Sequence, residues 1–482
     1  MPVRTKTLLA TVALTLVGAT QAHAATGDIK YLSGVRASDE VLLDEANGID
    51  ISDDGRHVYV AAQLDDAVNV FKRNSKTGKL RFVEAEVDGQ GGVAAMNGSR
   101  DVTVSPDGKN VYVTATVDNG LTEFDRNKKS GRLTFSEDEI DGEGVTYMDS
   151  PEQVAVSPDN RQVYVTSLTE DGVAFFHRSS GDLLSSGNFS SEEHHNGASG
   201  IAISPDGDTV IVGGFQGDQV AVYERSPGTG FLTFRMGLTD GLFAEGLDGV
   251  RGIAFNEKGD RVFFAGHGED ALSWYDYDAA EHDLTYRDDI TPNPEVFALT
   301  DPFGVTAVGK HVYVASETDG PGGGALGAFR VISNTALTAF DSVLDDDGKS
   351  QMLGRATEVV ASPDGAHLYV SAGEGSNNDD DDAVTALARD QKLKLKVKAA
   401  KSQKAGALTA KIRCSTACRI VAKAKSGSDS SKTVRKRLAA DVKRSVKLPL
   451  AGSAAGETAK VTVRAKNAFG ERKTQSKKVD VG

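Results

Sequence analysis

The sequence predicts an all-β chain in which a seven-bladed β-propeller is followed by a small β-sandwich. A turn motif recurs seven times at intervals of about 47 to 56 residues, which is typical of repeat architectures. Residues 391–482 carry 25 Lys and Arg against 5 Asp and Glu, a net charge of +20, whereas residues 1–390 carry −35. The 52 glycines suit short strands joined by many turns. The opposite net charges of these two segments exclude a single near-neutral globular domain.

Residues 1–24 have the pattern of a secretory signal peptide. Arg4 and Lys6 precede an uncharged apolar stretch over residues 8–19, and residues 22–24 read Ala-His-Ala, which suits cleavage before Ala25. That stretch is too short to span a bilayer comfortably, and no later segment is apolar enough to do so. We therefore expect a secreted protein that is extracellular or associated with the cell envelope.

The repeated units explain the propeller over residues 25–390. Residues 105–108 read Ser-Pro-Asp-Gly and precede Val-Tyr-Val at 111–113, and related turns occupy residues 52–55, 157–160, 204–207, 256–259, 308–310 and 362–365. Proline presets φ in such a turn and glycine accepts a positive φ. Each unit adds two further strands, so four antiparallel strands per repeat predict a propeller blade.

The seventh unit lacks an outer strand, because its third strand at 383–388 is followed by the basic segment. Residues 29–35 are predicted to supply that strand. Such pairing joins the two ends of the ring and removes two exposed sheet edges.

The starts of the innermost strands predict the ligand site, since these strands line the central channel. Polar groups that converge at a concave mouth favour ligand binding. We name as candidate catalytic residues Arg100, Glu152, Arg251 and Glu358, and as candidate ligand-binding residues Asn47, Asp101, Gln153, Ser199 and Phe303. An arginine suits polarisation of a carbonyl and a glutamate suits activation of water. Alternatively, Arg100–Glu152 and Arg251–Glu358 are structural ion pairs that fill the channel.

The loops on the predicted channel face are acidic, for example at Asp65 and Asp66 and at residues 379–382. Carboxylates held close together bind Ca²⁺, but no segment matches a known calcium loop. Solvated loops without a cofactor, or weak Ca²⁺ binding, are the two interpretations. No metal-binding residues are assigned.

Residues 391–482 form the second predicted domain. Residues 392–398 and 460–466 alternate apolar and cationic side chains, which indicates half-buried strands. About seven such strands predict a small immunoglobulin-like sandwich. Cys414 and Cys418 are expected to form a disulfide in an oxidising compartment. Attachment to an anionic cell-envelope polymer suits the charge, whereas a single aromatic residue, Phe469, provides no stacking platform for nucleic acid.

The repeated Ser-Pro-Asp-Gly and Val-Tyr-Val motifs resemble those of the seven-bladed lactonase propeller family. This family includes propeller-type 6-phosphogluconolactonases and looks related to YVTN-repeat surface proteins. The resemblance covers about residues 28–390 and implies a lactonase activity supported by Pro-x-His motifs and by channel Arg and Glu residues. None of the seven inner strands here begins with Pro-x-His.

Two functions follow from these observations. The first is an exported binding protein that recognises a small molecule or protein on its acidic channel face and attaches to an anionic surface through its basic domain. The alternative is a lactonase-like hydrolase that opens a sugar or organic-acid lactone at the channel with Arg and Glu residues. Whether the chain is an enzyme is left open at this point.

Overall fold

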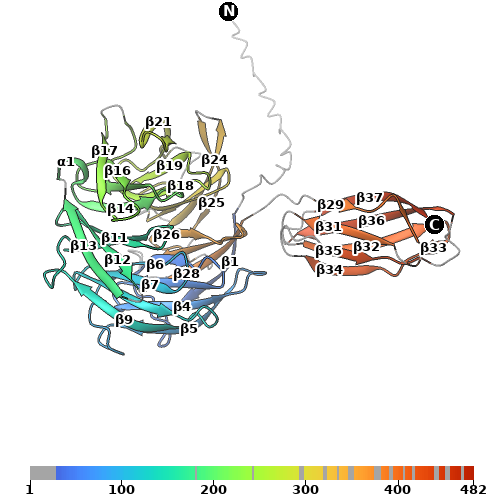
Figure 1. Cartoon of the computed structure of the whole chain (residues 1–482), viewed down its shortest axis with the longest axis horizontal. Coiled ribbons are helices and arrows are strands. Elements are labelled where there is room, and N and C mark those ends of the chain that lie inside the picture. The colour runs from blue at the N-terminus through green and yellow to red at the C-terminus, as the bar shows by residue number, and fades with distance from the viewer. Residues whose placement is uncertain are drawn as a thin grey trace, which may run out of the picture.

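The protein is described by a computed structural model, shown in Figure 1. The described residues are 29–179, 182–190, 192–241, 244–292, 298–317, 323–333, 336–345, 352–373, 382–389, 395–404, 406, 408–414, 418–438, 444–450, 456–467 and 472–482. The predicted signal peptide at residues 1–24 lies outside them, as does the acidic run at 379–381. Within the described part, no helix is long and apolar enough to cross a membrane.

Seven four-stranded antiparallel sheets form the propeller, as the repeats predict. Each blade runs from an inner strand through two middle positions to an outer strand (Figure 1). The described residues include one short helix, α1 (Glu192–His195), which follows the outer strand of blade three. Blades one to four are β2 (Ala46–Ile51), β3 (His57–Ala62), β4 (Ala67–Arg73) and β5 (Leu80–Val87); β6 (Ser99–Val104), β7 (Asn110–Ala115), β8 (Gly120–Arg126) and β9 (Leu133–Ile140); β10 (Pro151–Val156), β11 (Gln162–Ser167), β12 (Gly172–Ser179) and β13 (Asp182–Ser190); and β14 (Ala198–Ile203), β15 (Thr209–Gly214), β16 (Gln219–Arg225) and β17 (Leu232–Thr239). Blades five to seven are β18 (Val250–Phe255), β19 (Arg261–Gly266), β20 (Ala271–Asp278) and β21 (Asp283–Ile290); β22 (Pro302–Val308), β23 (His311–Ser316), β24 (Ala325–Ser333) and β25 (Ala336–Leu344); and β26 (Ala356–Ala361), β27 (His367–Ala372) and β28 (Ala383–Arg389), completed by β1 (Ile29–Arg36).

The expected closure of the ring is confirmed. β1 pairs with β28 in antiparallel fashion, with Ile29 opposite Arg389 and Arg36 opposite Ala383. The backbone N–H of Ile29 also donates to Asp341 of blade six at 2.6 Å. Blade seven therefore contains the first and the last strands of the propeller.

The propeller core is divided among the contacts between neighbouring blades. Each of its hydrophobic clusters draws residues from two adjacent blades, for example Tyr59 and Val70 of blade one against Val102 and Val113 of blade two. The middle residue of Val-Tyr-Val is fully buried in these clusters, as at Tyr59. The repeated strand motif thus builds the packing between blades.

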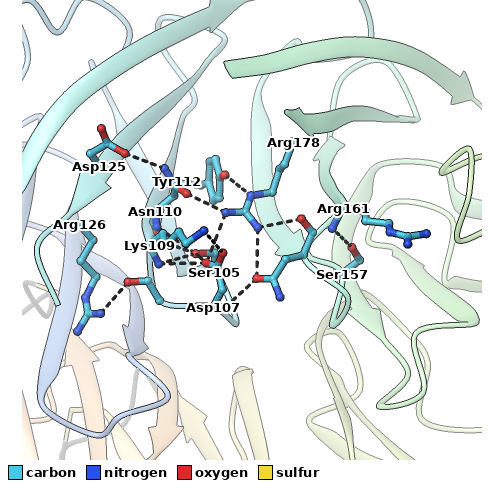
Figure 2. A network of polar contacts seen from close by, with 12 residues as sticks. Ser105, Asp107, Lys109, Asn110, Tyr112, Asp125, Arg126, Ser157, Arg161 and Arg178 are labelled. Carbon is cyan, nitrogen blue, oxygen red and sulfur yellow. Dashed lines mark hydrogen bonds and ion pairs between the residues drawn. The ribbon is translucent and has the colours of Figure 1, made fainter. Parts of the chain in front are cut away.

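An arginine at the end of the third strand ties most blades to the blade before. Arg178 of blade three donates to the hydroxyl of Tyr112 at 2.7 Å, to Asn110 Oδ1 at 2.7 Å and to the carbonyl of Asn160 in its own turn at 3.0 Å. Figure 2 shows Arg178 pointing toward Tyr112 and Asn110 of the neighbouring blade. Arg178 also lies 3.6 Å from the turn carboxylate of Asp107. We call this arrangement the arginine latch. The equivalent arginines are Arg73, Arg126, Arg225 and Arg389.

Blades five and six depart from this pattern. Blade five has Tyr277 at the latch position, and its hydroxyl contacts Thr209 of blade four. Blade six has Val331, and the tyrosine and turn aspartate that would face it are replaced by Phe263 and Lys258 of blade five. A groove of about 740 Å³ lies at this junction, lined in part by these three residues.

The acidic loops between second and third strands also join blades. Asp66 has a positive φ of 50°, a conformation that Asp and Asn tolerate better than most residues, and its carboxylate accepts the N–H of Gly98 from the next blade at 2.7 Å. The same bond is made by Asn119, Asp171, Asp218 and Asp270. Part of the acidity of this face is therefore structural.

The basic domain is a sandwich of two sheets around one aliphatic core. Buried residues such as Ile412, Val446 and Val461 alternate with exposed cations, as period-two strands require. The immunoglobulin-like topology stays a prediction. The side chains of Cys414 and Cys418 lie outside the described residues, so their disulfide also stays a prediction. The first sheet holds β29 (Leu395–Lys398), β31 (Thr409–Cys414) and β35 (Arg444–Lys447), and the second holds β30 (Ser402–Gln403), β37 (Arg472–Val481), β36 (Thr458–Asn467), β32 (Cys418–Ser426), β33 (Asp429–Ser430) and β34 (Val434–Leu438).

Candidate functional site

All seven inner strands carry an irregularity at their beginning. In β6 the register with β7 shifts between Ser99 and Val102, and β2, β10, β14, β18, β22 and β26 shift at the corresponding place. Such bulges change the direction of a side chain and often occur next to functional sites. The candidate site residues occupy the second and third positions of these strands.

The third position holds neighbouring blades together. The carboxylate of Asp101 accepts the N–H of Val154 at 2.9 Å. Gln153 accepts the N–H of Ile201 at 3.0 Å and Glu358 that of Ile49 at 3.3 Å. Three of the candidate residues therefore bond the backbone of the following blade.

Glycine takes the third position in the other four blades because the next strand comes too close for a side chain. A Cβ on Gly48 would lie 2.5 Å from the Cα of Asp101, and one on Gly252 would lie 2.3 Å from the carbonyl oxygen of Phe303. Neither distance is compatible with a van der Waals contact. The residue at the third position therefore serves the packing of neighbouring strands rather than contact with substrate, except in the blades where that residue is a carboxylate.

The second position brings Arg100, Glu152 and Arg251 together, and we call these three residues the channel triad. Arg100 donates from Nε to Glu152 Oε2 at 3.1 Å, and Nη1 of Arg251 lies 3.6 Å from the same oxygen. The Arg251–Glu358 pair considered from the sequence is not formed between these two described residues. Arg251 approaches Glu152 instead, so two guanidinium groups share one carboxylate.

Aromatic rings support both arginines. The ring of Phe303 has its centroid 5.3 Å from the guanidinium carbon of Arg100 and 4.6 Å from that of Arg251. Phe215 lies 4.0 Å from the guanidinium carbon of Arg251 on the same measure. Such contacts between cations and rings fix the planes of both guanidinium groups.

Electrostatic effects on the two arginines differ. Burial, reinforced by the charge of Arg100, lowers the pKa of Arg251 to about 10. Burial also opposes the charge of Arg100, but Glu152 outweighs it and raises the pKa of Arg100. The Nε of Arg251 is buried without a hydrogen-bond partner among the described residues. Arg251 is therefore the less compensated cation, with one buried donor that no described residue satisfies.

Three carboxyl groups lie on the inner strands. The charge of Arg100 acts on Asp101 and Glu358, and the charge of Asp101 acts on Asp50. Burial raises the pKa of Asp50 to about 7 and that of Asp101 to about 6. Burial, followed by the charge of Asp101, raises the pKa of Glu358 well above its ordinary value. Asp50 resembles the third-position residues in accepting the N–H of Val104 at 2.8 Å. Carboxyl groups whose pKa is raised toward neutral pH can exchange protons with a bound molecule.

Two candidate residues remain, Asn47 and Ser199, and each makes hydrogen bonds within the propeller. Asn47 donates to Gln63 Oε1 at 2.8 Å, and Arg100 donates to the same oxygen at 3.4 Å. The carbonyl of Ser199 accepts from Thr166 at 2.8 Å, and the residue as a whole is buried.

Sequence reasoning missed the residues that follow the second strands. Gln63, Phe215 and Glu317 each come directly after β3, β15 and β23, and each contacts or electrostatically influences the triad. Glu317 also lies 3.3 Å from Arg355, which reaches Glu45 at the same distance. The repeats contained a signal for these residues, because the pairing of the first two strands of a blade places the residue after the second strand beside the inner strand.

No group of three or more His, Cys, Asp or Glu residues within the described ranges could hold a metal ion. Weak Ca²⁺ binding by the acidic loops therefore stays a prediction without a located site.

The comparisons with known proteins agree with the propeller fold and with a relationship to lactonases. Residues 15–150 and 92–241 match the family model for the seven-bladed β-propeller lactonases. The chain is similar to the 6-phosphogluconolactonase of Bacillus subtilis, with 32% identity over 111 residues, which span 23% of this chain and only 30% of that enzyme.

Solved structures show the same fold at low sequence identity. A provisionally assigned 6-phosphogluconolactonase from Bacteroides fragilis has a TM-score of 0.53 at 16% identity, covering 69% of this chain and 90% of its own. A similarly assigned protein from Bacteroides uniformis has a TM-score of 0.52 at 15% identity, covering 63% of this chain and 84% of its own. Both likenesses concern the fold alone.

Proposed function

We propose that the propeller is a lactonase-like hydrolase whose reaction takes place at the channel triad. The observation that carries this proposal is the pair of guanidinium groups around the single carboxylate of Glu152, with one buried donor of Arg251 unused. The match to the lactonase family model supports it. The comparisons favour this function over a propeller that only binds, which was the first interpretation of the sequence.

The proposed chemistry is the addition of water to a lactone. Arg251 donates to the carbonyl oxygen and stabilises the oxyanion that forms when water adds to the carbonyl carbon. Glu358, whose pKa is raised by burial, takes the proton from that water as a general base. The ring C–O bond then breaks, the same proton passes to the leaving alkoxide, and a hydroxy acid is released.

Glu152 has a positioning role in this scheme. It contacts both guanidinium groups, so that their planes are fixed before substrate arrives. Phe303 and Phe215 complete this support from the sides. Binding energy is thus not spent on ordering two flexible arginines.

A lactone panel tests the proposal. The full chain is assayed against sugar and organic-acid lactones by acid release, with spontaneous hydrolysis subtracted. Arg251→Gln is expected to lower kcat by about 100-fold, the usual cost of losing one oxyanion donor, and Glu358→Gln by about 100-fold or more. Arg161→Gln is the control and should retain full activity, because Arg161 is exposed and follows the turn at the end of β10, whereas Glu152 lies at the beginning of that strand.

Two results would contradict the proposal. The absence of turnover on every lactone, with saturable binding of one of them, would establish a binding protein instead. Turnover that survives both substitutions would place the reaction elsewhere on the chain.

We also propose that the chain is exported and that its basic domain attaches it to an anionic component of the cell envelope. The amino-terminal pattern at residues 1–24 and the charge of +20 over residues 391–482 support these two proposals. A pulse-chase experiment with signal-peptidase inhibition tests export, because only an exported chain shortens at Ala25.

A further inference from the structure

The second sheet of the basic domain aligns its cations across strands. Lys425 of β32 lies opposite Lys460 of β36, which lies opposite Lys478 of β37. In the rows beside it, Lys423 lies opposite Thr462 and Val421 opposite Arg464. All four of these lysines and Arg464 are exposed. They form one face, and we call it the lysine face.

This alignment opposes folding. Directly opposed residues in antiparallel strands have Cβ atoms about 5 Å apart, and like charges at that spacing are destabilising. No described carboxylate forms an ion pair with these five cations. Ala424 and Val461 already supply the buried side of the same strands, so the fold needs only a soluble residue at the outer positions. The repeated choice of lysine therefore indicates a role outside the domain.

A shallow groove of about 490 Å³ runs over this face and is lined by Lys423, Lys425, Lys460 and Arg464 among others. Thr462 adds a hydroxyl, and no aromatic side chain lines the groove. Recognition on this surface must therefore depend on charge and hydrogen bonds, because stacking on bases or sugar rings needs an aromatic platform.

We propose that the lysine face is the docking surface for a linear cell-envelope polymer with a phosphodiester backbone. This inference deepens the proposed attachment to the envelope and rests on it. Four of the five cations are lysines, which bind phosphate as point charges, and Arg464 can pair with a phosphate through two parallel hydrogen bonds. Positions are about 5 Å apart across strands and about 7 Å apart along them, so one extended chain can contact several cations at once.

Binding is measured by fluorescence anisotropy with the full chain and a labelled synthetic poly(glycerol phosphate). Each phosphate contact to a flexible polymer contributes about −0.7 to the slope of log affinity against log salt. Five contacts predict a slope of about −3.5, which is a loss of about 100-fold between about 50 and 200 mM NaCl. Replacing Lys423, Lys425 and Lys460 together by glutamine should reduce the slope to about −1.4.

A matched control uses the other sheet of the same domain. The triple replacement of Lys398, Lys411 and Lys447 by glutamine removes the same charge from exposed positions of β29, β31 and β35, and it should change the slope by less than one unit. An equal loss in both triple variants would overturn the assignment of the face.

Three further readouts decide the outcome. The lysine-face variant should melt at the same or a higher temperature than the parent, because it loses like-charge repulsion, so weaker binding cannot be attributed to misfolding. Polygalacturonate or oligo(dT) of equal charge that binds more tightly than the poly(glycerol phosphate) would overturn the proposed partner. Lactone turnover should be unchanged in this variant, which separates this inference from the proposed activity.

Discussion

Removing one arginine latch should destabilise the propeller through the junction of two blades. Arg225 is almost fully buried and donates to Asp159 at 2.8 Å, to the carbonyl of Gly207 at 2.7 Å, to the hydroxyl of Tyr164 at 3.2 Å and to the side-chain oxygen of the buried Gln162. Arg225→Met keeps the length of the aliphatic stem and removes all four bonds. The substitution therefore isolates the polar part of the latch.

The expected loss of stability follows from the polar groups that lose Arg225 as their partner. Tyr164 keeps a second bond to the carbonyl of Gly230 at 2.7 Å, and the Asp159 side chain is 34% exposed, so water replaces part of its lost partner. The carbonyl of Gly207 loses its donor. Losing one partner of a fully buried ion pair costs about 3–5 kcal/mol, and partial exposure places this case near the lower limit, at about 3 kcal/mol.

Equilibrium unfolding in guanidinium chloride measures the loss, with the fluorescence of Trp274 as the probe, since this only tryptophan of the chain is fully buried in blade five. Arg161→Met is the matched control, because Arg161 is exposed and lies 4.0 Å from the same Asp159. Its effect should stay within about 0.5 kcal/mol. Equal effects of the two substitutions would refute the latch as a source of stability.

The pH dependence offers a second check on the same variant. Burial opposes ionisation of Asp159, but the Ser157 hydroxyl and Arg225 outweigh it and hold its pKa below the usual value. A carboxyl with a lowered folded-state pKa contributes stability that is present above its unfolded pKa of about 3.9 and is lost as the pH falls through the folded pKa. The difference between parent and Arg225→Met should therefore be largest near pH 7 and shrink below about pH 4. A difference that is constant down to pH 2 would contradict the charge-based account.

Three further predictions concern the ring. Gly48→Ala should destabilise the propeller by about 1–3 kcal/mol in the same unfolding assay, because its Cβ would overlap the backbone at Asp101; an unchanged midpoint would show that the strands separate freely. Lys258→Asp, Phe263→Tyr and Val331→Arg together should rebuild a latch at the groove between blades five and six and raise the melting temperature, whereas a fall would show that the groove cannot accept a guanidinium. Burial lowers the pKa of His195 to about 4 in the folded state, whereas the pKa of an unfolded histidine is about 6.5. Between these two values the unfolded state binds the proton first, so the free energy of unfolding falls with falling pH by up to about 1.4 kcal/mol per pH unit. His195→Phe should flatten that decline between about pH 6.5 and 4, as measured by thermal melts across this range.

The sequence was sufficient to predict the propeller because the same blade motif recurs in seven repeats. The Ser-Pro-Asp-Gly turn and the buried Val-Tyr-Val strand are local signals, and the strand at Ile29 was predicted because blade seven otherwise has an unpaired edge. The pairing of Arg100 with Glu152 was also predictable, since adjacent blades bring equivalent positions side by side.

The finer arrangement of the site was not predictable, because it depends on distances across the ring. Arg251 was considered as a partner of Glu358 but lies near Glu152. Nothing in the composition of an inner strand distinguishes a channel-facing second position from a third position that bonds the next blade, as Gln153 does. The bulge that separates them is a property of strand pairing. The acidic loops raised the same difficulty, because Asp66 binds a backbone N–H rather than a ligand.

The pairing of β1 with β28 has a consequence for the order of events during synthesis. Ile29 emerges early and Arg389 must follow before the two can meet, so the seventh blade cannot be completed until six others have been made. Contacts between such distant residues form slowly, and until then β28 presents an open edge on which another chain can pair. We therefore expect refolding to end in a slow closing step whose yield falls at high protein concentration. A separately added peptide spanning residues 29–36 should compete for that edge and trap chains in a form that does not close.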